Sequence, residues 1–273
     1  MQSNIILDLE KKGLIKPPEW LSSNLVYISI VGSISYGASN TNRISDIDLF
    51  GICVPPKSIV FPHSIGKILG FDEIEDFSIY EKHHINENEK EYDVLVRSII
   101  SFFKLIKRSN PNIIDSLFCS QDEILYTTKV GDIIRNNRHM FLSKKCFSTF
   151  KEYAFSNLTK MQSKKPDEKG KRYELVKKYG YDVKFAMHCV RLLLELEQIL
   201  SEGTINLKKN KDQLRSIKKG EWSIEELKKW AISKEKELIF LYENSKIQKE
   251  IDELKIKKLL VECLEVHYES LEK

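Results

Sequence analysis

The sequence has few of the features that mark secreted or membrane proteins. Its five cysteines are odd in number, lie far apart and include no Cys-x-x-Cys pair, which argues against a disulfide framework and a zinc site. No apolar run approaches the roughly 20 residues that a membrane span needs, and the N-terminus has no basic segment before an apolar stretch. Internal repeats and low-complexity segments are also absent. These absences predict a reduced, cytoplasmic protein without a membrane partner.

The charge of the chain is small but unevenly distributed. With 44 Lys and Arg against 40 Asp and Glu, the formal net charge is +4. Residues 1–125 hold 12 basic and 17 acidic residues, so residues 126–273 hold 32 and 23. Such an asymmetry indicates either a polyanionic partner of the second half or helices with lysine-rich solvated faces. Composition leaves both alternatives open.

Strand patterns dominate the chain up to about Tyr126. Residues 25–31 and 46–54 are apolar runs rich in β-branched residues, and residues 77–85 and 91–96 are separated by the polar stretch NENEK. Runs of this length and composition are typical of strands, and the second pair is predicted to form a hairpin. A sheet is therefore expected in the first half of the chain.

Helical patterns follow this region and take over completely after residue 126. Pro111 is well placed to begin a helix after the helical pattern of residues 97–110. Ser223 and Glu226 have the spacing of a capping box, and Gly203 is a plausible helix end. The longest helical patterns cover residues 145–164, 181–203 and 223–272. The chain is therefore predicted to be α+β, with a sheet-containing domain in residues 1–125 and an all-helical, basic domain in residues 126–273.

One stretch, VGSISYGASNTNRISDIDLFG from Val31 to Gly51, has an unusual order of residue types. An apolar strand ends at Gly32 and Ser33, where glycine allows a tight turn and close approach of a ligand. A short helix is expected over residues 33–39, and free N–H groups at its start, with the serine hydroxyl, would favour a phosphate. The alternative is a strand edge followed by an ordinary turn.

Two aspartates follow in the next strand. Asp46 and Asp48 are two residues apart, so both side chains project from one face of the strand. Two such carboxylates repel one another unless a cation lies between them, and oxygen ligands with room for phosphate and water suit Mg²⁺. A third carboxylate is expected from the neighbouring strand, where Asp93 is preferred because it lies nearer the apolar centre; Glu91, on the same face, is the alternative. This set predicts metal-assisted nucleotidyl or phosphoryl transfer.

Together these residues resemble the DNA-polymerase-β-like nucleotidyltransferase superfamily. The resemblance is closest to the YcgL/RlaP family of predicted nucleotidyltransferases, some of which are encoded beside RNA ligases, and it runs from about Val26 to Leu227. It implies the nucleotidyltransferase fold, a mixed β-sheet with flanking helices. The motifs that carry it are GSISYG, SDIDLFG, NPNIIDSLF, GYDVKFAMHCVRLL and GEWSIEEL.

The resemblance also implies an enzyme that uses an NTP with Mg²⁺, or Mn²⁺, to transfer a nucleotidyl group. Asp46 and Asp48 would bind both metals, and Asp93 would complete the metal that activates the attacking hydroxyl. The residues that would hold the nucleotide in this first half of the chain are Gly32, Ser33 and Ser45.

A helical stretch supplies further candidates for nucleotide binding. Its residues Tyr181, Lys184, His188 and Arg191 fall on one predicted face, whereas Phe185, Cys189 and Leu192 form a core stripe. Lys184 and Arg191 are predicted to bind the β- and γ-phosphates, with His188 beside them. The alternative is a solvated basic face with a structural histidine.

Signals for the acceptor are weaker. Residues 163–180 combine basic residues with Tyr173 and Tyr179, a composition that suits single-stranded nucleic acid or a solvated loop. His83 and His84 are interpreted as surface residues, because adjacent residues on a strand point in opposite directions. The first hypothesis is addition of nucleotides to an RNA 3′ end, such as that of tRNA, in RNA repair or modification. The alternative is nucleotidylation of a protein hydroxyl, such as AMPylation; a fold that only binds nucleotide is disfavoured by the intact aspartate set.

Overall fold

A computed structural model describes residues 4–39, 46–68, 70–163 and 171–271. Its described residues form one five-stranded sheet in the order β3-β4-β2-β1-β5. β2 and β4 run parallel, and the other neighbours are antiparallel. The predicted mixed sheet with flanking helices is confirmed. The strands are β1 (Leu25–Val31), β2 (Ile47–Cys53), β3 (Ile79–Glu87), β4 (Lys90–Ser98) and β5 (Ile124–Thr127).

The strands carry apolar residues on both faces of the sheet, and each face packs against a hydrophobic core. On one face, α1 (Ile5–Lys11) contributes Ile6 and Leu9 to a smaller core. The other face packs against a larger core that includes residues of both halves of the chain. Three helices that begin between residues 99 and 129 contribute to it: α3 (Ile99–Ile106), α4 (Pro111–Phe118) and α5 (Lys129–Asn136). Pro111 begins α4 as predicted.

The second half of the chain is helical, as predicted, apart from the last residues of β5. Its central helix is α8, whose N-cap is Asp182 and whose C-cap Gly203 has a left-handed backbone. The predicted capping box of Ser223 and Glu226 is present at the start of α10. Among the described residues, the α-helices that follow α5 are α6 (Cys146–Ser163), α7 (Lys171–Tyr179), α8 (Val183–Glu202), α9 (Lys211–Lys218), α10 (Ile224–Asn244) and α11 (Glu253–Leu271).

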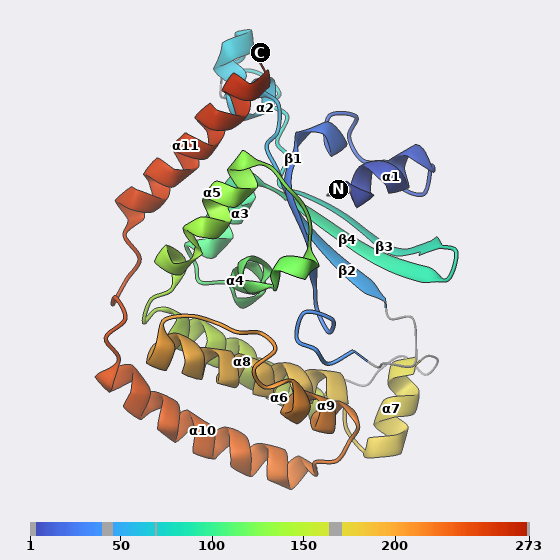
Figure 1. Ribbon diagram of the computed structural model, residues 1–273, viewed down its shortest axis with the longest axis vertical. Coiled ribbons are helices and arrows are strands. Elements are labelled where there is room, and N and C mark those ends of the chain that lie inside the picture. The colour runs from blue at the N-terminus through green and yellow to red at the C-terminus, as the bar shows by residue number, and fades with distance from the viewer. Residues whose placement is uncertain (1–3, 40–45, 69, 164–170, 272–273) are drawn as a thin grey trace.

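The last helix returns to the sheet region, as Figure 1 shows. His267 of α11 hydrogen-bonds Asn24 at 3.1 Å, and the Tyr268 hydroxyl donates to the backbone oxygen of Pro55 at 2.7 Å. The division at residue 125 stays a prediction; that position lies inside β5, a strand that sequence patterns did not predict. Within the described residues, no helix is both long and apolar enough to cross a membrane.

Candidate active site

The segment after β1 forms successive turns rather than the expected short helix. The N–H of Tyr36 donates to the Gly32 oxygen at 3.3 Å, and that of Ala38 donates to the Ser33 oxygen at 2.9 Å. Gly32 has φ +73°, and a Cβ there would lie 2.1 Å from Oδ2 of Asp48. Glycine is therefore required at position 32 for two reasons: the left-handed backbone and the close approach of the carboxylate.

The sheet brings two of the predicted carboxylates together. Asp48 of β2 and Asp93 of β4 are direct partners in the parallel register, and Asp46 lies two residues before Asp48. Burial raises the pKa of Asp48, and the nearby charges of Asp93 and Asp46 raise it further, whereas Lys184 lowers it. Asp48 is thus a partly buried acid with excess negative charge around it, a condition that a cation would relieve.

Asp93 is held by an irregularity of β3 that sequence alternation did not reveal. The register between β3 and β4 shifts between Lys82 and Ile85, and His84 has φ +55°. The backbone N–H of His84 donates to Asp93 Oδ1 at 2.8 Å, and His83 Nδ1 lies 3.3 Å from Asp93 Oδ2. The hydrogen bond to Asp93 raises the pKa of His83. Both histidines are exposed, but the bulge directs His83 to the site.

The competing carboxylate, Glu91, has a different partner. Its Oε1 contacts Nδ1 of His84 at 2.5 Å, and its register partner is Asn86 on β3 rather than a residue of β2. Of the two acids on β4, Asp93 is therefore the one that the register places beside Asp48.

The donor chemistry of the three aspartates fits Mg²⁺, although no preformed cage is present. Within the part of the chain that the structure describes, no three His, Cys, Asp or Glu side chains gather closely enough to hold a metal ion. Asp93 already contacts the β3 bulge through both oxygens. Mg²⁺ is commonly held by one or two carboxylates together with substrate phosphates. Paired aspartates beside the turn at Gly32 fit that mode.

Two cations from the helical half face the carboxylates. Lys184 of α8 is exposed, and its charge acts on Asp48. Lys218 of α9 was not predicted: burial lowers its pKa, as does Lys184, whereas Asp46 and Asp48 raise it. Its Nζ donates to the Ala38 oxygen at 3.0 Å, so it also anchors the turn segment.

Arg215 of α9 makes a second anchor, from Nε to the Gly37 oxygen at 2.6 Å. Neither Lys218 nor Arg215 carries a local sequence signal, since their role depends on contacts with residues about 180 positions earlier.

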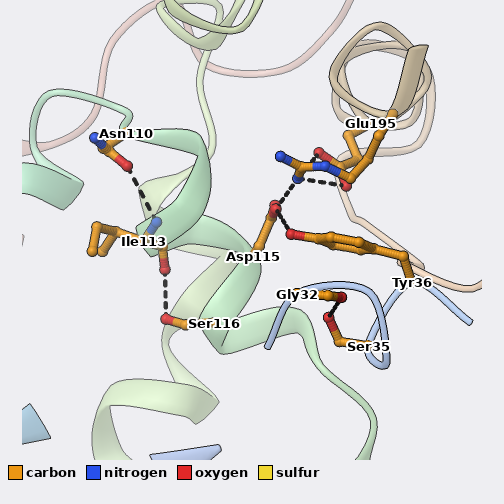
Figure 2. A network of polar contacts seen from close by, with 9 residues as sticks. Gly32, Ser35, Tyr36, Asn110, Ile113, Asp115, Ser116 and Glu195 are labelled. Atoms are coloured by element: carbon orange, nitrogen blue, oxygen red, sulfur yellow. Dashed lines mark hydrogen bonds and ion pairs between the residues drawn. The ribbon is translucent and has the colours of Figure 1, made fainter. Parts of the chain in front are cut away.

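Arg191 does not occupy the exposed position that the helical spacing predicted. Its side chain is buried, 3% exposed, and Nη1 donates to Asp115 of α4 and to Glu195 of α8. The hydroxyl of Tyr36 donates to the same Asp115 Oδ2 at 3.0 Å, a contact that Figure 2 shows. Burial opposes ionisation, but Glu195, Tyr36 and Asp115 hold the pKa of Arg191 above its usual value. The structure thus places Arg191 in a buried network that joins the turn segment to α4 and α8, and its role in phosphate binding stays a prediction.

The other predicted residues are dispersed. Tyr181 is buried and donates to the backbone oxygen of Trp222 at 2.6 Å, and His188 is half-buried. Cys189 and Leu192 belong to the core as expected, and Phe185 packs partly buried against it. Ser45 and the basic residues Lys164 and Lys165 lie outside the described residues.

A family model and a solved structure are similar to this chain. Residues 10–271 match the model of a family described as RlaP, RNA repair pathway DNA polymerase beta family. A solved structure of a nucleotidyltransferase-like protein from Exiguobacterium sibiricum 255-15 is similar to this chain, with 12% sequence identity and a TM-score of 0.31. The match covers 96% of this chain and 73% of the chain in that structure. No curated protein sequence matches the chain. Because the family match covers nearly all its residues, the chain belongs to the RlaP family of RNA repair pathway DNA polymerase β-like proteins.

Proposed function

We propose that this protein is a Mg²⁺-dependent nucleotidyltransferase that transfers a nucleotidyl group from an NTP to the hydroxyl at an RNA 3′ end, such as that of tRNA. The observation that supports this most is the pairing of Asp48 with Asp93 beside the Gly32 turn. Membership of an RNA repair family of polymerase β-like proteins supports the reaction class and a nucleic-acid acceptor.

In this proposal Asp46, Asp48 and Asp93 hold Mg²⁺, and Mn²⁺ would suit the same oxygens. When bound, the metal neutralises charge on the phosphates and lowers the pKa of the attacking hydroxyl. Burial raises the pKa of Asp48, and the charges of Asp93 and Asp46 raise it further.

The chain's own groups bind and orient the triphosphate. The backbone N–H groups of Ser33, Ile34 and Ser35 donate to no backbone oxygen among the described residues, so they are suited to phosphate oxygens. Lys184 and Lys218 supply positive charge near the same carboxylates. Catalysis of this kind rests on positioning and electrostatics, and the protein needs no covalent nucleophile.

The test is to incubate the full chain with each radiolabelled NTP, Mg²⁺ and either total RNA or lysate protein. We expect the label in RNA, and its absence with Asp48→Asn. Label in polypeptide would replace the RNA acceptor with a protein hydroxyl. No label in either, from a protein that is folded, would contradict the proposed activity.

Salt dependence tests the RNA acceptor separately. If basic residues of the second half contact RNA phosphates, affinity for a tRNA-sized RNA falls steeply between about 50 and 200 mM salt. Neutralising Lys164, Lys165, Lys171 and Arg172 together should reduce that slope and leave NTP binding unchanged. A flat salt curve for the unmodified protein would contradict the RNA acceptor.

A further inference from the structure

A polar groove lies between α6 and α8, beyond the residues assigned above to the carboxylate site. It has a volume of about 570 Å³ and is lined by α6 residues such as Tyr153 and Asn157, by His188 and Arg191 of α8, and by Asn112 in the first turn of α4. Ligand pockets of proteins commonly have volumes of about 300–1,000 Å³. The groove is therefore large enough for a nucleoside.

The position of the groove relative to the carboxylates follows from α8. Lys184, whose charge acts on Asp48, lies on the same face of α8 as His188 and Arg191, which line the groove. At a rise of about 1.5 Å per residue, His188 and Arg191 lie about 6 and 10 Å further along the helix. In an NTP, the ribose separates the base from the α-phosphate. A triphosphate bound at the carboxylates would thus place its base near the groove.

The charges that line the groove favour an uncharged portion of a nucleotide over its phosphate chain. At its floor, the guanidinium of Arg191 is already paired with Asp115 and Glu195, so this cation adds no net positive charge. At the rim, the acid Glu152 offsets the base Lys160. A second polyanionic group therefore has little to attract it there.

The side chains on the walls match a nucleobase. Tyr153 is 42% exposed and offers a ring for stacking, and stacking of a base on an aromatic side chain is worth about 1–3 kcal/mol. The Asn112 amide, the amide oxygen of Asn157 and the Glu152 carboxylate provide donors and acceptors, the groups that recognise base edges; Nδ2 of Asn157 donates to the Tyr153 backbone oxygen at 2.8 Å. The buried link from Arg191 through Asp115 to Tyr36 connects this wall to the turn at Gly32.

We propose that this groove is the binding site for the nucleobase of the NTP, with Tyr153 as the stacking residue and Asn112 as a hydrogen-bonding residue. The inference rests on the proposed function, since it takes the triphosphate to lie at the carboxylates. It assigns base recognition to α6 and α4 and phosphate binding to the turn segment, Lys184 and Lys218.

The test compares the affinities of the full chain for the four NTPs and for inorganic triphosphate, each with Mg²⁺. Tyr153→Ala should weaken NTP binding about tenfold, in line with a lost stacking contact, and leave triphosphate binding unchanged. Tyr153→Phe should retain NTP affinity because it keeps the ring. Asn112→Ala should change the relative affinities of the four NTPs. Phe240→Ala, which removes an exposed aromatic ring of α10, is the matched control and should change nothing.

Unchanged NTP affinity in folded Tyr153→Ala would overturn the inference, as would an equal loss for inorganic triphosphate. If Tyr153→Ala keeps its NTP affinity but binds RNA more weakly, the groove belongs to the acceptor instead. If the unmodified protein binds inorganic triphosphate but no NTP more tightly, the groove inference fails alone. If it binds neither, the proposed function fails as well.

Discussion

Two groups of acidic residues lie near the turn segment, and the structure treats them in opposite ways. Asp46, Asp48 and Asp93 gather at the sheet with lysines and a histidine nearby. Asp115 and Glu195 are buried in the helical layer, 2% exposed, and share Nη1 of Arg191. The acids of the first group lie near three separate cations, Lys184, Lys218 and His83, whereas those of the second share a single buried guanidinium.

The contrast separates residues available for a ligand from residues that hold the fold. Burial, and after it the charges of Asp93 and Asp46, raises the pKa of Asp48; an acid in such surroundings costs stability in the unliganded protein, and such costs are typical of functional sites. Burial also raises the pKa of Asp115 and Glu195, and the charge of Arg191 lowers it, so removing this cation would leave two buried acids without their partner.

The largest effect is expected from removing Arg191, the cation that Asp115 and Glu195 share. Arg191→Met should lower the free energy of unfolding by about 3–5 kcal/mol, because it leaves two buried acids without their cation. Chemical denaturation would measure this. Adding Asp115→Asn and Glu195→Gln should recover part of the loss, whereas Lys209→Met, which removes an exposed ion pair with Glu202, should have little effect. A stable Arg191→Met protein that binds inorganic triphosphate weakly would support Arg191 as a phosphate ligand.

The next effect concerns the aspartates at the sheet, Asp46, Asp48 and Asp93. Asp48→Asn should reduce nucleotidyl transfer by about 10³-fold, a magnitude known for loss of a single electrostatic contact at a reacting centre. Thermal unfolding should occur at the same or a higher temperature, because the amide removes repulsion with Asp46 and Asp93. Asp212→Asn, an exposed change on α9, is the control. Activity at saturating NTP in Asp48→Asn would show that the site is misplaced.

A smaller and more selective effect would distinguish the two acids of β4. Asp93→Ala should reduce transfer by at least 10²-fold and retain NTP binding, since the nucleotide is held mainly by the turn, the lysines and the other aspartates. Glu91→Ala should keep most of the activity. Single-turnover rates and NTP affinities of both variants would measure this split, and the reverse ranking would transfer the role to Glu91.

The smallest effect is expected at the junction between the two groups. Tyr36→Phe removes the hydroxyl that donates to Asp115 and should cost about 1 kcal/mol of stability, with a loss of NTP affinity because the turn is less firmly held. Tyr27→Phe is the matched control, since its buried hydroxyl donates to the Ser116 oxygen at 2.9 Å. Equal NTP affinities in the two variants would reduce the Tyr36 contact to a purely structural one.

Local patterns were sufficient for much of the fold and for part of the site. The apolar runs predicted β1, β2 and the β3–β4 hairpin, the capping box of Ser223 and Glu226 marked a helix start, and Gly203 marked a helix end. The prediction of a short helix after Gly32 was wrong. The turns found there are anchored by Lys218 and Arg215, which are distant in sequence and leave no local signal. The bulge that directs His83 toward Asp93 was missed, since alternation assumes a regular strand.

The sequence by itself determined the residue types at each position: a glycine where a left-handed turn is needed, two aspartates on one strand face, and an arginine at helical spacing from Lys184. Tertiary structure decided their partners. Parallel pairing of β2 with β4 placed Asp93 beside Asp48, and packing of α4 on α8 buried Arg191 against Asp115, 76 residues away. The physical reason is that periodicity reports which face of an element is apolar, whereas the charge that a buried residue meets depends on which element packs against that face.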